Sequence, residues 1–424
     1  MFRTLILIAI LLSASGALGV QRVQPPEFEE HELPTTETPA PAAAAWQYAD
    51  VAVLAAALSL AAWLVLKRRS RRGVFLLMIF SIAYFGFWRK GCVCPVGAIQ
   101  NVALAAVDSS YALPFAVLAF FMLPLFFALF FGRVFCSSVC PLGGAQDLVV
   151  FRPIRIPLWL EHALGLLTYA YLGAAVLFAI TGTTFLICRY DPFIALFRLS
   201  GNRDMLVMGA AFVLLSMFIG RPYCRFLCPY SVLLRVLSRV SRWRVSIAPD
   251  ECIQCRLCED ACPYGAIRKP AQSQETPSRS EGKVRLAVLL FLLPALMLVT
   301  GWLGHLGGNG FSRMNASIRR AERLWLYEKG KLSEAEDEVA AFRKTGKTFQ
   351  QAYTEARSVR TNYSRTGWLL GAWIGFVIGM KLIVLSVRRR RTNYEPERGA
   401  CLACARCYAS CPKEHQRLKK QGAR

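Results

Sequence analysis

Long apolar runs divided by short basic segments are the main pattern of this chain. Runs of about twenty apolar residues are long enough to cross the hydrocarbon core of a bilayer as helices. We therefore expect a mainly α-helical, polytopic membrane bundle with six or seven spans. The predicted spans are 47–66, 73–89, 112–131, 158–180, 203–220, 284–303 and 366–387.

The N-terminal segments have a different composition. Residues 1–20 carry one early arginine, an apolar stretch and small residues, which is typical of a signal peptide or an uncleaved anchor. Residues 21–46 are rich in proline and acidic side chains and predict a disordered extracytoplasmic linker. Residues 47–245 then form the predicted membrane domain.

Composition and charge agree with a membrane protein. Hydrophobic residues make up 55 % of the chain and the mean hydropathy is +0.37, which is more than a soluble core requires. In a soluble chain, the net charge of +24 would suggest a nucleic-acid partner. Here the basic clusters at 67–72, 235–244 and 388–391 flank apolar runs, which is the positive-inside pattern. The expected partner is the lipid bilayer, and nucleic acid is excluded.

Two cysteine runs of the form C-x2-C-x2-C-x3-C-P stand on either side of the last two spans. This is the spacing of bacterial ferredoxins, in which the fourth cysteine of each run binds the cluster of the other run. The crossover predicts two 4Fe–4S clusters. One would be held by Cys252, Cys255, Cys258 and Cys411, and the other by Cys401, Cys404, Cys407 and Cys262.

The crossover also constrains the topology. The ferredoxin halves, 246–283 and 388–424, must lie on one side of the membrane, which we expect to be cytoplasmic. The segment 304–365 between the last two spans is then extracytoplasmic, and its composition predicts a helical hairpin. Two alternatives stay open for the cysteines: structural zinc, which also uses C-x2-C pairs, and disulfides, which a reducing cytosol disfavours.

The membrane domain contains a repeat. Residues 132–141 and 220–229 both read G-R-x-aromatic-C-x3-C-P. One span earlier in each unit stands another element that ends in proline, Cys92-Val93-Cys94-Pro95 in the first and Cys188 to Pro192 in the second. Two hairpins of the same orientation predict an axis of symmetry along the membrane normal.

This repeat predicts two further groups of ligands. An inner set of four thiols suits an iron–sulfur centre or another tetrahedral thiophilic metal. An outer set has Asp191 where the other unit has Cys94. Packing cysteines, or a disulfide between Cys92 and Cys94, are the open alternatives. The inner set is Cys136, Cys140, Cys224 and Cys228, and the outer set is Cys92, Cys94 and Cys188.

Other cofactor chemistry is poorly represented. The chain has four histidines and no C-x-x-C-H, which excludes attached c-type haem. No phosphate-binding loop or dinucleotide fingerprint occurs. Thr181 to Thr184 resemble a covalent flavin site faintly, and an ordinary helix end explains them better. With iron–sulfur motifs as its main cofactor sites, we expect the chain to be an electron-transfer subunit of an oxidoreductase system rather than a stand-alone catalyst. Its electron donor and acceptor must then be separate proteins or quinone.

The paired G-R-x-[FY]-C-x3-C-P elements, the spans around them and the ferredoxin cysteines resemble the NapH/NosR group of membrane-bound polyferredoxins over about 73–268 and the last cysteine run. This resemblance implies a bacterial inner-membrane protein that moves electrons between quinol or cytoplasmic donors and extracytoplasmic redox systems. The sequence departs from NosR in showing no N-terminal flavin-binding domain, and from NapH in separating its cluster motifs by two spans. Nitrate and nitrous oxide metabolism are therefore not implied.

Two functions follow as hypotheses. In the first, the chain is a transmembrane electron conduit between a cytoplasmic donor or quinone and an extracytoplasmic flavoprotein or reductase. Because the hydrocarbon layer is about 30 Å thick, such a conduit needs a centre inside the membrane domain. In the second, the chain is a maturation factor whose C-x3-C-P thiols handle copper or reduce a metal centre of a periplasmic reductase.

Overall fold

The computed structural model describes a large part of the chain. The predicted signal segment and most of the predicted linker lie outside this part, and the last three residues of that linker are the start of a helix. The described residues are 44–91, 94–181, 184–198, 203–247, 252–270, 279–313, 315–331, 339, 342, 346–387, 391 and 393–420.

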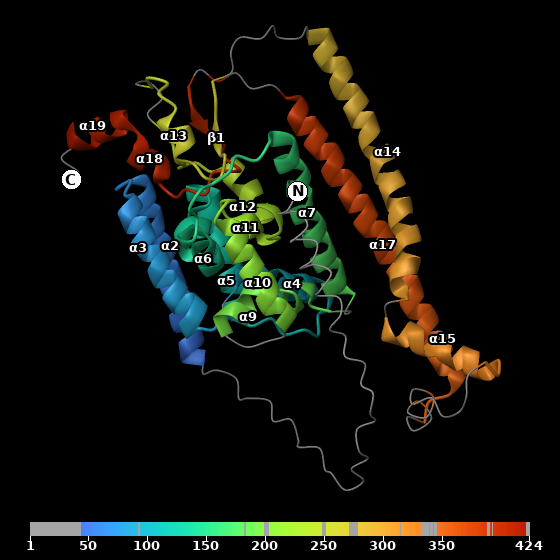
Figure 1. The fold of residues 1–424 in the computed structure, drawn as a ribbon. Coiled ribbons are helices and arrows are strands. Elements are labelled where there is room, and N and C mark those ends of the chain that lie inside the picture. Colours follow the sequence, from blue (N-terminus) through green and yellow to red (C-terminus); the bar gives the residue numbers. More distant parts are fainter. Residues whose placement is uncertain are drawn as a thin grey trace, which may run out of the picture. The chain divides into compact units, whose positions relative to one another are not determined.

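The structure is mainly helical (Figure 1), as the apolar pattern predicts. Among the described residues, five helical segments are long and apolar enough to cross a membrane, so the chain is a multi-pass membrane protein. They are α2 (Ala44–Leu66), α3 (Arg71–Ser81) with the π-helical η2 (Ile82–Trp88), α7 (Leu158–Ile180), α14 (Arg279–Ser312) and α17 (Phe349–Ser386).

Two of the seven predicted spans form shorter helices. The span expected at 112–131 is α5 (Phe115–Phe131), which begins after Pro114 and ends at Gly132 with φ of 74°. The span expected at 203–220 is α10 (Arg203–Ser216), after which the chain turns toward Arg221 in the left-handed conformation. The predicted spans start three residues before α5 and continue four residues past α10, so composition alone overestimated the length of both helices.

Short helices connect these segments and surround the cysteines. They are α4 (Pro95–Val107), η3 (Phe135–Val139), α6 (Pro141–Leu148), α8 (Leu186–Arg189), α9 (Pro192–Arg198), α11 (Pro222–Phe226) and α12 (Tyr230–Arg239). One hydrophobic core joins them to α2, α3 and the ferredoxin segments.

The helices α14 and α17 run side by side through a seam of glycines (Figure 1). A Cβ on Gly304 would overlap the carbonyl oxygen of Gly367, so only glycine allows this approach. At 34 residues, α14 extends about 50 Å, more than the roughly 30 Å of hydrocarbon. The hairpin predicted at 304–365 therefore begins as a continuation of α14, and its helix α15 (Ala316–Glu328) packs on α17.

The two ferredoxin halves form one module. Strand β1 (Ile267–Arg268) pairs antiparallel with β2 (Glu395–Pro396), so that Ile267 lies opposite Pro396. Helix α13 (Leu257–Asp260) from the first half packs against α18 (Arg406–Ser410) from the second, and α19 (Pro412–Lys420) follows. Segments separated by α14 and α17 in the sequence are thus joined at one end of the membrane helices (Figure 1).

Candidate iron–sulfur sites

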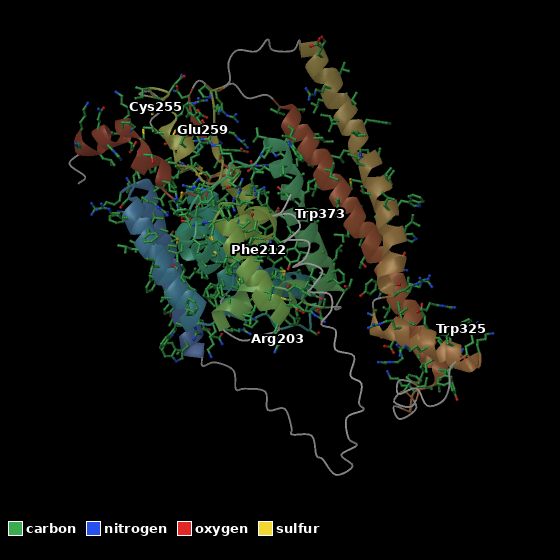
Figure 2. The ribbon with its side chains drawn as sticks, in the orientation of Figure 1. Arg203, Phe212, Cys255, Glu259, Trp325 and Trp373 are labelled. Atoms are coloured by element: carbon green, nitrogen blue, oxygen red, sulfur yellow. The ribbon has the colours of Figure 1, made fainter. Side chains whose placement is uncertain are left out.

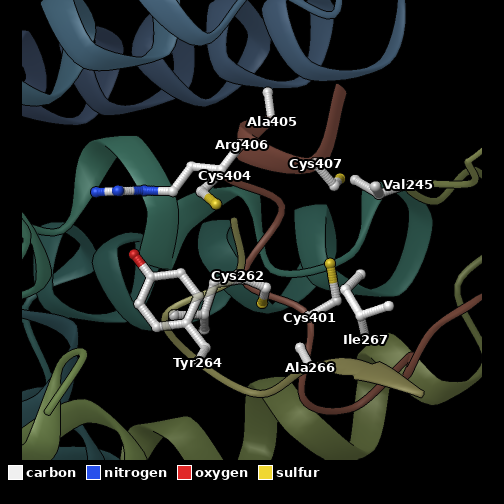
Figure 3. A pocket seen from close by; sticks show the side chains of 11 residues that line it. Val245, Cys262, Tyr264, Ala266, Ile267, Cys401, Cys404, Ala405, Arg406 and Cys407 are labelled. Atoms are coloured by element: carbon white, nitrogen blue, oxygen red, sulfur yellow. The ribbon is translucent and has the colours of Figure 1, made fainter. Parts of the chain in front are cut away.

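One cavity is lined by four cysteines from both ferredoxin halves (Figure 3). Cys262 comes from the first half, and Cys401, Cys404 and Cys407 come from the second. The structure therefore brings together one of the two sets of cluster ligands that the crossover predicts. We call this cavity the inner cluster cavity. Its other lining residues are Val245, Tyr264, Ala266, Ile267, Leu402, Ala405 and Arg406.

A second cavity is lined by the complementary set. Cys252, Cys255 and Cys258 come from the first half and Cys411 from the second. The residues around Cys255 are exposed at the surface of the module (Figure 2), whereas Cys407 in the inner cluster cavity is buried. We call this second cavity the outer cluster cavity. Its charged lining residues, Arg256 and Lys413, are both basic.

Both cysteine loops have the same unusual backbone geometry. Gln254 and Arg256 have φ of 53° and 65°, and the equivalent Ala403 and Ala405 have φ of 54° and 61°. A left-handed backbone conformation is energetically unfavourable for residues other than glycine. Here it turns the chain sharply, so that successive thiols face one cavity. Strained backbone of this kind is found at functional sites. The equivalence of the two loops indicates one kind of ligand for both.

The grouping of the thiols bears on the candidate cofactors. Within the described residues, no group of three or more His, Cys, Asp or Glu side chains is arranged to hold a single metal ion. A 4Fe–4S cube distributes its ligands over separate irons, whereas structural zinc draws four ligands onto one ion. The described cysteines are also all free thiols. Two cavities, each lined by the four thiols that the crossover groups, fit the two cubes that the spacing predicts.

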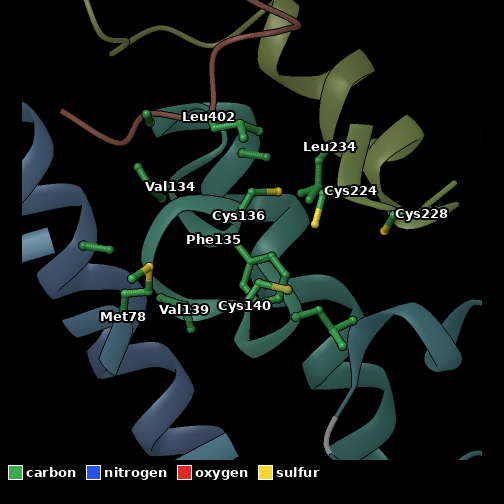
Figure 4. Close-up of a cluster of buried hydrophobic side chains, with 14 of the residues drawn as sticks. Met78, Val134, Phe135, Cys136, Val139, Cys140, Cys224, Cys228, Leu234 and Leu402 are labelled. Carbon is green, nitrogen blue, oxygen red and sulfur yellow. The ribbon is translucent and has the colours of Figure 1, made fainter. Parts of the chain in front are cut away.

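The four inner thiols of the membrane repeat are buried near one another. In Figure 4 the sulfur of Cys136, from η3, lies next to that of Cys224, from α11. The thiol of Cys140 lies within electrostatic range of Cys224, Cys136 and Cys228. Proline after Cys140 starts α6 and thereby turns the chain at the thiol. The folded chain thus brings the two C-x3-C-P elements of the repeat together.

Polar side chains point at two of these sulfurs. A guanidinium nitrogen of Arg133 lies 3.7 Å from the sulfur of Cys136, and the amide nitrogen of Gln146 lies 3.4 Å from that of Cys224. The oxygen of Gln146 accepts a hydrogen bond from the backbone of Tyr223. Donors near sulfur are a common means of adjusting the reduction potential of a thiolate-bound centre.

The structure brings Cys94 of the outer set close to the inner set, and the outer site itself stays a prediction. Cys94 and Asp191 line one cavity together with Cys140 of the inner set. The sulfur of Cys188 lies 3.2 Å from the position of a Cβ on Gly97, next to this cavity. Helices α4 and α6 both start at a Cys-Pro pair, and their first residues, Pro95 and Pro141, line the same cavity. Cys92 lies outside the described residues.

Asp147 was not singled out by sequence reasoning, yet it joins the membrane domain to both ferredoxin halves. Its buried carboxylate lies 3.0 Å from Arg71, 3.2 Å from Arg406 and 3.4 Å from Arg221, and it accepts a hydrogen bond from Tyr264. Burial raises the pKa of Asp147, but Arg221 and Arg406 outweigh burial and hold this pKa below its ordinary value of 3.8. The carboxylate is therefore charged.

Comparison with known protein families gives the same chemistry. Residues 113–158 and 204–248, which contain the two C-x3-C-P elements, match a family model described as a 4Fe-4S binding domain. Residues 245–268 match a second model with that description. The chain carries iron–sulfur domains of ferredoxin type.

Three curated proteins illustrate the similarity. YccM of Escherichia coli, named as a candidate electron transport protein, is 27 % identical over 40 % of this chain and 52 % of its own length. The methylamine utilization ferredoxin-type protein MauN of Methylobacillus flagellatus is 30 % identical over 35 % and 54 %. The regulatory protein NosR of Stutzerimonas stutzeri is 26 % identical over 47 % and 29 %.

The chain is a distant homologue of these polyferredoxin-type membrane proteins. The matched part covers about half or less of the length of each of these three relatives. The homology therefore concerns the iron–sulfur domains. No solved structure matches this polyferredoxin-type chain.

Proposed function

We propose that this chain carries electrons across the bacterial inner membrane, between cytoplasmic 4Fe–4S clusters and an extracytoplasmic redox partner. The observation that carries the proposal is the division of the ferredoxin cysteines between two cavities, each framed by three thiols of one half and one of the other. Cys252, Cys255, Cys258 and Cys411 would hold one cluster, and Cys401, Cys404, Cys407 and Cys262 the second. When bound, such clusters exchange single electrons at potentials set by charge, hydrogen bonds and exposure.

The protein side chains arrange these sites in a series. The outer cluster cavity opens near exposed Cys255, where a cytoplasmic donor protein or quinone would approach. The inner cluster cavity is next to the membrane domain, because Arg406 and Tyr264 from its lining both contact Asp147. The inner thiols and the Cys94 cavity follow. The hydrocarbon layer is about 30 Å thick, so electron transfer across it requires an intermediate site. In this order, the membrane thiols would provide that site.

Sidedness follows from the charges that flank the spans. The ferredoxin module joins segments next to basic clusters, which the positive-inside rule assigns to the cytoplasm. An extracytoplasmic flavoprotein or reductase would then accept electrons at the far end of the repeat. The chain itself acts as an electron-transfer subunit in this proposal, and the reaction is completed by its partners.

Metal analysis separates this proposal from a maturation role. We expect purified full-length protein to contain iron and acid-labile sulfide in excess of two cubes, with more than two low-potential centres in a redox titration. The double variant Cys136→Ser/Cys224→Ser removes two membrane thiols and should lower the iron content while both ferredoxin signals persist. Copper bound in place of iron, and lost in this variant, would support the maturation factor, because soft thiolates select copper.

A further inference from the structure

The two arginines of the repeated G-R elements are in unequal electrostatic surroundings. Arg221 in the second element lies 3.4 Å from the carboxylate of Asp147, which stands seven residues after Cys140. The equivalent position seven residues after Cys228 is Arg235. The arginine of the first element, Arg133, therefore faces a second cation where its counterpart faces an anion.

Arg133 is buried without an acidic partner. Its side chain donates to the carbonyl of Gly399 at 3.2 Å and points at the sulfur of Cys136, while its Nε has no hydrogen-bond partner. Arg133 is 2 % exposed. Within the described residues, neither Arg133 nor Arg235 forms an ion pair. The carboxylate of Glu397, which is near Arg235, is already bonded to Arg268.

An unpaired cation in this position requires an anion. Moving a charge out of water without a partner is strongly unfavourable, so proteins pair buried charges or use them at functional sites. The thiols within electrostatic range of Arg133 belong to two sites: Cys224 in the inner membrane set and Cys401 in the inner cluster cavity. Gly399, which Arg133 binds, lies two residues before Cys401.

We propose that Arg133, supported by Arg235, is a shared counter-ion between the inner cluster cavity and the membrane thiols, and that it raises the reduction potential of the centre in each. This inference rests on the proposed function. A thiolate-bound iron–sulfur centre is an anion and gains one negative charge on reduction, so a nearby fixed cation favours the reduced form. Because the same guanidinium lies near both sites, it raises both potentials together and positions the segments that carry Cys136 and Cys401.

Redox titration of the full-length protein, followed by electron paramagnetic resonance, tests this role. In Arg133→Gln the neutral side chain can still donate to Gly399, but the cation is gone. We expect the midpoint potential of the cluster that depends on Cys401 to become more negative, together with that of the membrane centre, at unchanged iron content. Arg133→Lys should return both potentials toward the wild-type values. The cluster that depends on Cys252 serves as the internal reference and should not shift.

Arg244→Gln is the matched control, because it removes the same charge from an exposed position next to Val245, which lines the inner cluster cavity. It should leave all potentials unchanged. Unshifted potentials in Arg133→Gln, or an equal shift of the reference cluster, would overturn the counter-ion role and leave the electron-transfer proposal intact. If Arg133→Gln does not fold, Arg235→Gln decides the question: a smaller negative shift confined to the same two centres supports the role, and no shift refutes it. Absence of low-potential signals from the wild type contradicts the proposed function itself.

Discussion

Replacing Asp147 by asparagine is expected to cost the folded protein about 3–5 kcal/mol, the usual effect of removing one partner from a buried ion network. The substitution leaves Arg71, Arg221 and Arg406 without their shared anion at a site where the carboxylate is fully buried. Because Arg406 and Tyr264 belong to different ferredoxin halves, we expect the module to separate from the membrane helices, with loss of iron from the inner cluster cavity.

Thermal unfolding in detergent, together with the iron content, measures this effect. Asp260→Asn is the matched control, because it makes the same chemical change in an exposed pair with Arg155, which is worth only about 0–1 kcal/mol. Equal stability of Asp147→Asn and Asp260→Asn would show that the network does not hold the module in place.

The stabilisation from Asp147 has a defined pH dependence. Its pKa in the folded protein is lowered, so its contribution is complete above the pKa of the unfolded chain and is lost as pH falls through the folded value. We therefore expect wild type and Asp147→Asn to differ in stability at neutral pH, to begin to converge only below about pH 4, the ordinary pKa of an aspartate, and to become equal only below the lowered pKa of the folded protein.

Cys262→Ala is expected to abolish the signal of the cluster that depends on Cys401, Cys404 and Cys407, although these cysteines are far away in sequence. The reason is geometric, since Cys262 lines the inner cluster cavity with them. Cys411→Ala is the reciprocal variant and should remove the signal of the other cluster, because Cys411 lines the outer cluster cavity. Iron content and electron paramagnetic resonance of both variants, compared with wild type, measure the effect. The crossover would be contradicted if each variant instead lost the signal of the cluster that the other cysteines of its own run hold.

The spacing of cysteines contained most of what was needed to locate the ferredoxin sites. A C-x2-C-x2-C loop is a local structure, so its geometry follows from short-range constraints, and the left-handed residues between Cys252 and Cys258 recur between Cys401 and Cys407. The length of the apolar runs was similarly sufficient to predict α2, α7 and α17, which are long and apolar enough to cross a bilayer.

Features that depend on packing could not be predicted in this way. Helix α5 begins only after Pro114 and helix α10 ends before the turn at Arg221, and an apolar composition reveals neither boundary. The meeting of Cys94 with Cys140 depends on where two short helices begin in space. Asp147 and Arg235 occupy equivalent places in the repeat, but only the folded structure shows that one meets three arginines and the other meets Arg133.

Electron transfer across a sealed membrane tests the central claim most directly. Full-length protein is reconstituted into liposomes that enclose ferricyanide, and dithionite is added outside as an impermeant reductant. We predict that the wild type reduces the enclosed ferricyanide, and that Cys136→Ser and Cys224→Ser do so far more slowly while both ferredoxin signals persist. A conduit through the membrane thiols would be contradicted if the wild type reduced ferricyanide no faster than protein-free liposomes do. It would also be contradicted if both variants reduced ferricyanide at the wild-type rate.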